Sequence, residues 1–139
     1  MEEEISILKG RIARNTIEQV QPAADSQGLL LMQEEVRNIF IHDRIYHYIG
    51  RLAQATRNNP MIELGVSPRG SLALARMAQA SAYLRNKTYV TPDDIRGILM
   101  DVWAHRILLN AKARISHLTP DAVLEEILKS VPAPSLRKT

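Results

Sequence analysis

Three segments of this chain begin with a hydroxyl residue followed directly by proline, at Ser67-Pro68, Thr91-Pro92 and Thr119-Pro120. A Ser or Thr side chain can cap the free N–H groups at a helix start, and proline at the first helical position loses no hydrogen bond. The two later segments continue into acidic residues, which suit the positive end of the helix dipole. We therefore expect three helices to begin at these dipeptides.

Apolar residues at helical spacing predict further helices over residues 5–12 and 29–36, and from Asp43, as N-cap, to the stop at Asn58-Asn59-Pro60. The Ala-rich segment from Pro68 to Arg85 is apolar around most of its circumference, which favours a place in the middle of a bundle. β-Branched residues in the run 39–41 favour a short extended segment, which we expect to pair with a short strand at residues 89–90. The predicted fold is therefore an all-α bundle of about five or six helices, with room for one short two-stranded β pairing.

Composition narrows the classes of protein. The length of 139 residues suits one domain, and aromatic residues make up only 4%, which argues against an all-β sandwich. Cysteine is absent, which excludes disulfides, thiolate metal sites and a cysteine nucleophile. The longest apolar run, Leu29 to Met32, is too short for a membrane span, and the acidic N-terminus is unlike a secretory signal. We expect a cytoplasmic protein.

The net charge is +3 and the pI is about 9.4, with arginine much commoner than lysine. Arginine forks bind phosphate well, but a solvated surface explains this bias better than a nucleic-acid patch does. No metal site is predicted, because His42 and His47 are five residues apart and His105 and His117 stand alone. Trp103 and Phe40 are expected in the core. Asp93-Asp94 is explained by helix capping, since consecutive helical residues point apart.

The segment from Gly65 to Ser71 has the glycine spacing of a P-loop but lacks its lysine, and no strand is predicted before it. Its Arg69 is of more interest, because it falls at the second position of a helix, where acidic residues are preferred. A cation beside free N–H groups suits a phosphate. An exposed arginine without any role would cost roughly a few tenths of a kcal/mol there, so spacing alone leaves both interpretations open.

Four sequence blocks carry a resemblance to a known family. They are Ala55-Thr56-Arg57, Leu64 to Arg69, Tyr89 to Ile95, and His105-Arg106. In this order and spacing they resemble the C-terminal lid of MoxR-type AAA+ ATPases. The resemblance implies a helical lid beside a nucleotide-binding core, with residues 1–28 as the connecting helix and linker, 29–131 as the lid and 132–139 as a flexible tail.

The same resemblance implies site residues and partners. Arg69 would be the sensor-2 arginine that reaches ATP phosphates, with Ser67 and Pro68 beside it, and Arg57 and Arg106 would be structural or would contact a neighbouring subunit. ATP and Mg²⁺ would be held mainly by the core of the full-length protein, a ring homo-oligomer with chaperone-like remodelling activity. The Walker motifs are absent here, so this chain alone is expected to be inactive. The alternative is a non-enzymatic helical module that binds DNA or a protein partner, because Lys87 to Ile95 resembles the strand-then-helix turn of histone-like folds and the pI allows contact with a polyanion.

Overall fold

The computed structural model describes residues 1–13 and 20–135. The chain forms two compact units, residues 1–32 and residues 33–139. In the first unit, α1 (Glu2–Ala13) begins with three acidic residues, which suit the helix dipole. Next comes α2 (Ser26–Arg37), which crosses into the second unit. Because the Asp25 carboxylate accepts a 2.7 Å hydrogen bond from the Gly28 N–H, α2 starts at Ser26, inside the predicted linker.

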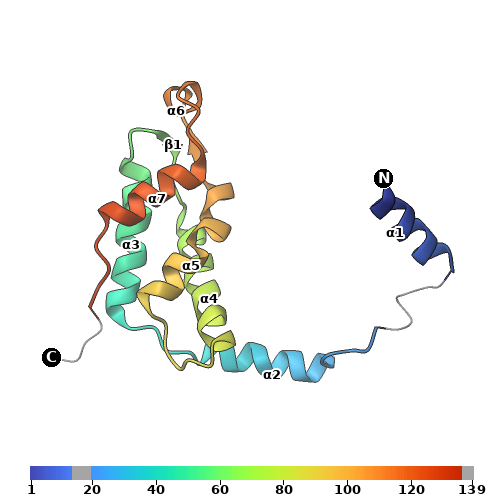
Figure 1. Cartoon of the computed structure of the whole chain (residues 1–139). Coiled ribbons are helices and arrows are strands. Elements are labelled where there is room, and N and C mark those ends of the chain that lie inside the picture. Colours follow the sequence, from blue (N-terminus) through green and yellow to red (C-terminus); the bar gives the residue numbers. More distant parts are fainter. Residues whose placement is uncertain (14–19, 136–139) are drawn as a thin grey trace. The chain divides into compact units, whose positions relative to one another are not determined.

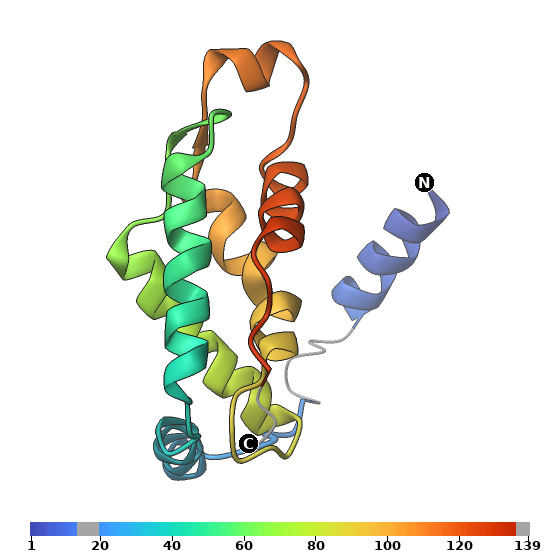
Figure 2. The same ribbon diagram turned by 90° about the vertical axis from the view of Figure 1, so that its left-hand side faces the viewer.

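The second unit is a helical bundle (Figures 1 and 2). Its long helices are α3 (Asp43–Asn58), α4 (Pro68–Leu84), α5 (Pro92–Trp103) and α7 (Pro120–Ser130). In this bundle α4 packs against α5 and α3, and α7 packs against α3 and α5. A 3-10 turn, Ala104–Arg106, follows α5, and the short α6 (Ala111–Ile115) lies before α7. The predicted helical fold class and all three Ser/Thr-Pro helix starts are confirmed.

One face of each long helix in this unit forms a single core. Its largest fully buried side chains come from α3, α4, α5 and α7 and from the segments before α4 and α5: Tyr48, Ile45, Leu52, Thr56, Val66, Leu74, Val90, Asp94, Ile95, Leu99, Trp103 and Leu124. Trp103 therefore lies in the core, as predicted. Phe40 does not, since 61% of it is exposed. Its neighbours Ile39 and Ile41 are buried, so the alternation of an extended segment turns Phe40 outward.

The short β pairings are partly as predicted. A single parallel bridge joins Phe40 to Tyr89, which agrees with the expected pairing of these two segments. The two-stranded sheet lies elsewhere, where β1 (Ile62–Leu64) pairs antiparallel with β2 (Leu108–Leu109). Strands of three and two residues are too short for a period-2 pattern to reveal them.

Two local predictions are wrong. The N-cap of α3 is His42, not Asp43, because the Nδ1 atom of His42 accepts a 3.1 Å hydrogen bond from the Arg44 N–H. The second error concerns α4, which is not buried around most of its circumference: Leu72, Met77 and Leu84 are 50%, 49% and 80% exposed. Its buried face is made of small or branched residues, namely Gly70, Leu74, Ala75, Ala78 and Ala82. Alanines on this face let α4 pack closely on one side, and the other side stays in solvent.

The segment predicted to be a flexible tail, 132–139, is bonded to α3 in its described part. Two arginines of α3 donate hydrogen bonds to it, Arg51 to the Pro132 carbonyl at 3.1 Å and Arg44 to the Ser135 carbonyl at 2.7 Å. Residues 136–139 lie outside the described residues. The flexibility of this tail, like the other domain boundaries, stays a prediction.

Candidate functional site

Arg69 occupies the second position of α4, directly after Ser67 and Pro68. Ser67 is the N-cap, and its hydroxyl oxygen accepts a 3.3 Å hydrogen bond from the Gly70 N–H. The first turn of α4 holds no acidic residue. Arg69 is exposed and has no hydrogen-bond or ion-pair partner among the described residues. It therefore adds an unneutralised positive charge at the positive end of the helix dipole, where the Arg69 N–H has no partner among the described residues.

Val66, which precedes the cap, is fixed through both of its backbone polar groups. Its N–H donates a 3.0 Å hydrogen bond to the Thr56 hydroxyl, and its carbonyl accepts a 2.8 Å hydrogen bond from Arg57 Nε. Both side chains belong to the last turn of α3. The Thr56 hydroxyl in turn donates to the Ala53 carbonyl at 2.7 Å. The segment that enters α4 is thus attached to the end of α3.

Two glycines allow this close packing. A Cβ at Gly65 would lie 2.7 Å from both Cα and N of Arg57, which are backbone atoms. A Cβ at Gly70 would lie 2.7 Å from Cγ1 of Val66. Contacts this short essentially never occur at real Cβ atoms, so a side chain at Gly65 would force the backbone of Arg57 to move and one at Gly70 would force Val66 to shift.

The other side of the helix start is fixed by Trp103, the last residue of α5. Its indole Nε1 donates a 3.0 Å hydrogen bond to the Gly70 carbonyl, and the side chain is fully buried. Gly70 directly follows Arg69 in the chain. The backbone on both sides of Arg69 is therefore bonded to the core of the bundle, whereas the Arg69 side chain extends from it into solvent.

The structure brings the three arginines of interest to the same segment. Arg57 bonds to Val66, and Arg106 Cδ lies 3.7 Å from the position that a Cβ of Gly70 would take. Arg106 Nε donates to the Val102 carbonyl at 2.9 Å, within its own helix and turn. In the described part of the chain, neither Arg57 nor Arg106 forms an ion pair, and their terminal nitrogens have no partner. Whether they also contact a neighbouring subunit stays a prediction.

Sequence reasoning missed the supporting residues Thr56 and Trp103. Thr56 stands inside the block Ala55-Thr56-Arg57, but nothing in the block predicts that its hydroxyl bonds ten residues ahead. Trp103 was expected in the core, without a partner for its N–H. A buried indole N–H generally needs an acceptor, so the sequence could have predicted that Trp103 donates a hydrogen bond, although not to which residue.

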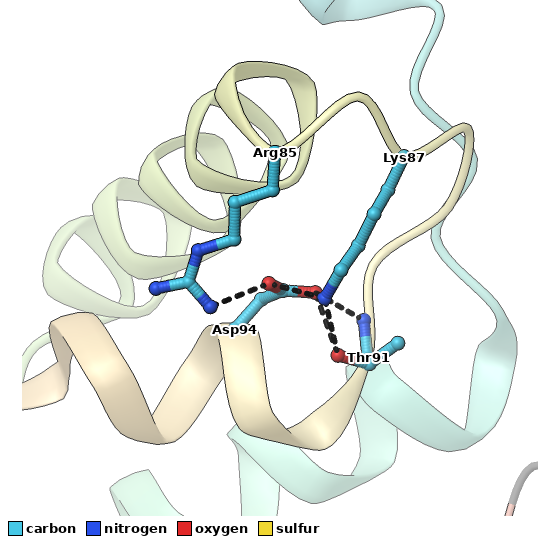
Figure 3. Close-up of polar contacts among 4 residues, drawn as sticks. All are labelled: Arg85, Lys87, Thr91 and Asp94. Atoms are coloured by element: carbon cyan, nitrogen blue, oxygen red, sulfur yellow. Dashed lines mark hydrogen bonds and ion pairs between the residues drawn. The ribbon is translucent and has the colours of Figure 1, made fainter.

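The start of α5 uses the same cap and proline but is neutralised internally (Figure 3). Asp94 is fully buried, and Lys87 Nζ lies 2.9 Å from its Oδ1 while Arg85 Nη1 lies 3.5 Å away. Its Oδ2 accepts hydrogen bonds from the N–H and the hydroxyl of Thr91, at 2.9 and 2.6 Å. Burial by itself raises the pKa of Asp94, but the bonds from Thr91 and Lys87 outweigh it and lower that pKa below its usual value. The predicted capping role of this carboxylate is confirmed.

Other features of the described residues lie apart from Arg69. A shallow hollow of about 410 Å³ lies between the end of α2 and the far end of α4, lined by Glu35, Asn38, Ile39, Tyr83, Asn86, Lys87 and Thr88. No group of three or more His, Asp or Glu side chains gathers as a metal site in the described residues. No helix within residues 1–13 and 20–135 is long and apolar enough to span a membrane.

Comparison with known proteins identifies the class to which this domain belongs. The family model of the AAA lid domain matches residues 54–127, which is more than half of the chain and includes Arg69 and the side chains that bond to Val66 and Gly70. The chain therefore belongs to the AAA lid domain family, and it is similar in sequence to proteins named MoxR.

Three relatives illustrate this. The uncharacterized protein YeaC of Bacillus subtilis is 36% identical over 97% of this chain and 42% of its own length. The chaperone MoxR1 of Mycobacterium tuberculosis is 29% identical over 85% of this chain and 34% of its own length. The crystal structure of a putative ATPase from Cytophaga hutchinsonii superposes with a TM-score of 0.83 at 28% identity, covering 96% of this chain and 43% of that one. The chain thus spans less than half the length of each of these relatives.

Proposed function

We propose that this chain is a sensor-2 lid that places the guanidinium of Arg69 against the phosphates of ATP bound by a nucleotide-binding core of the same protein. The lid itself does not hydrolyse ATP. Hydrolysis changes the charge that Arg69 faces, so the angle of the lid follows the state of the nucleotide. In a ring homo-oligomer this movement drives chaperone-like remodelling of a client protein. Mg²⁺ is held by the core.

The observation that carries the proposal is the unpartnered charge of Arg69. Arg57 and Arg106 each donate a hydrogen bond through Nε to a backbone carbonyl. Arg69 instead stands exposed at a helix start that contains no acid. Phosphate oxygens would meet the planar guanidinium and the backbone N–H of Arg69. Pro68 has no N–H and the Gly70 N–H is already bonded to the Ser67 hydroxyl, so the guanidinium is the main contact.

The test uses the protein that joins this lid to its nucleotide-binding core. We expect Arg69→Ala to lower kcat for ATP hydrolysis by about 10- to 100-fold, since a hydrogen bond to a charged group contributes about 1.5–3 kcal/mol. Arg76→Ala is the matched control, because Arg76 is an exposed arginine on the same helix, away from its start. Unfolding temperature shows that the lid stays folded. Unchanged turnover in Arg69→Ala would overturn the proposal.

The alternative of a DNA- or protein-binding module depends on the segment 87–95. Its basic residue Lys87 is engaged by Asp94, so this charge is not free to meet a polyanion. A mobility-shift titration of the chain with duplex DNA in low and high salt tests the alternative, and salt-sensitive binding would favour it over the lid role.

A further inference from the structure

We propose that Thr56 and Trp103 are positioning residues that set the direction in which Arg69 extends from α4. This inference rests on the proposed function of Arg69. No side chain in the described residues holds the guanidinium itself, so its position depends on the backbone at its base. That backbone is bonded to the bundle core at two places, Val66 and Gly70, by the buried side chains of Thr56 and Trp103.

Thr56 acts through Val66. Both residues are fully buried, and the Thr56 hydroxyl is the acceptor for the Val66 N–H at 3.0 Å. A helical threonine commonly donates its hydroxyl hydrogen to a carbonyl of the preceding turn, and Thr56 donates to the Ala53 carbonyl at 2.7 Å. The same hydroxyl oxygen still accepts the hydrogen bond from Val66, which belongs to a different segment. Without the hydroxyl, the buried Val66 N–H loses its partner and the entry to α4 is free to shift.

Trp103 acts through Gly70. Its ring fills the core and its Nε1–H points at the carbonyl of the residue that follows Arg69, at 3.0 Å. Gly70 is buried against Val66, so the two bonded positions are also packed against each other. The first turn of α4 is therefore fixed to the end of α3 through Thr56 and to the end of α5 through Trp103. A long side chain amplifies any tilt of this turn, and displacements of about 1 Å can cost up to about 100-fold in rate.

The experiment uses substitutions that remove one hydrogen-bonding group, in the protein that carries both core and lid. Thr56→Val replaces the hydroxyl by a methyl group and Thr56→Ser keeps it, whereas Trp103→Phe removes the N–H together with part of a fully buried ring. Each is measured alone and combined with Arg69→Ala, with kcat and KM for ATP recorded separately at a temperature well below unfolding. We expect Thr56→Val and Trp103→Phe to lower kcat about 3- to 10-fold, a part of the Arg69→Ala effect.

The combined variants distinguish positioning from general damage. If Thr56 and Trp103 act through Arg69, neither substitution lowers kcat further once Arg69 is alanine, and Thr56→Ser restores the rate. The inference is overturned if Thr56→Val and Trp103→Phe lower kcat as much in the Arg69→Ala background as in the parent. It is also overturned if Thr56→Ser is as slow as Thr56→Val. Should Arg69→Ala itself leave kcat unchanged, it is the proposed function that fails, which is a separate result. If Thr56→Val does not fold, Trp103→Phe, measured alone and combined with Arg69→Ala, decides the question by the first criterion.

Discussion

The starts of α4 and α5 share one sequence signature and differ in electrostatics. Each has a hydroxyl cap and a proline at the first helical position. The first turn of α5 carries Asp93 and Asp94, of which Asp94 is fully buried, bonded to the cap and paired with Lys87. The first turn of α4 carries Arg69, which is exposed, of the opposite sign and without a partner among the described residues. The charge at α5 therefore stabilises the fold, whereas the charge at α4 contributes nothing visible to it and is available to a ligand.

The largest effect is expected from Asp94→Ala. Removing the carboxylate leaves Lys87 and Thr91 without their common partner and removes the cap. We expect the free energy of unfolding to fall by about 2–4 kcal/mol. This is less than the loss usual for breaking a fully buried ion pair, because the side chains of Lys87 and Arg85 are 33% and 53% exposed. Arg69→Ala is the counterpart and should change stability by less than about 0.5 kcal/mol. Urea unfolding, followed by fluorescence of the single tryptophan, measures both. Equal losses would remove the contrast between the two helix starts.

Alanine substitutions at Gly70 in α4 and Gly97 in α5 compare how tightly the two helices are packed. Gly70→Ala forces a methyl group against Val66, 2.7 Å away, and should destabilise the chain by about 1–3 kcal/mol through overpacking. Gly97→Ala in α5 is the control, because its nearest neighbour is the flexible end of Arg85 at 3.7 Å. There the better helix propensity of alanine should add about 0.5–1 kcal/mol. Thermal unfolding of both variants checks this, and a stable Gly70→Ala would show that the α4 start is not rigidly packed.

The two helix starts also differ in how they respond to acid. Because the pKa of Asp94 is lower in the folded chain than in the unfolded chain, its contribution to stability is present above the ordinary Asp pKa of about 3.9. It is lost as the pH falls through the lowered folded-state pKa. We expect Asp94→Asn to lose less stability than the parent between pH 5 and the acid limit, as measured by urea unfolding at a series of pH values. Arg69→Ala should keep the parent profile; a profile that flattens equally in this variant would contradict the assignment to Asp94.

The same contrast shows how far sequence reasoning reaches. Cap, proline and dipole rules act within one turn, so they predicted the helix starts and singled out Arg69. The hydrogen bonds of Val66 and Gly70 connect residues ten and 33 positions apart, and no local pattern encodes such pairs. The wrong N-cap of α3 has a local cause, because a histidine nitrogen replaced the acidic oxygen that the preference rules favour. The sequence therefore does not predict the hydrogen bonds that hold Val66 and Gly70, whereas its local spacing does place Arg69 at the second position of a helix.

The smallest predicted effect tests the premise that Arg69 opposes the helix dipole. Arg69→Glu places a negative charge where α5 and α7 already carry acids, and should raise the free energy of unfolding by about 0.3–1 kcal/mol at low ionic strength. The gain should shrink in about 1 M salt, because the site is exposed and screened. Arg76→Glu, in the middle of α4, controls for the loss of positive charge in general and should not show this gain. Urea unfolding in both salts measures the difference. If Arg69→Glu and Arg76→Glu behave alike, the arginine costs the fold nothing, and its position against the dipole ceases to be evidence that a ligand requires it.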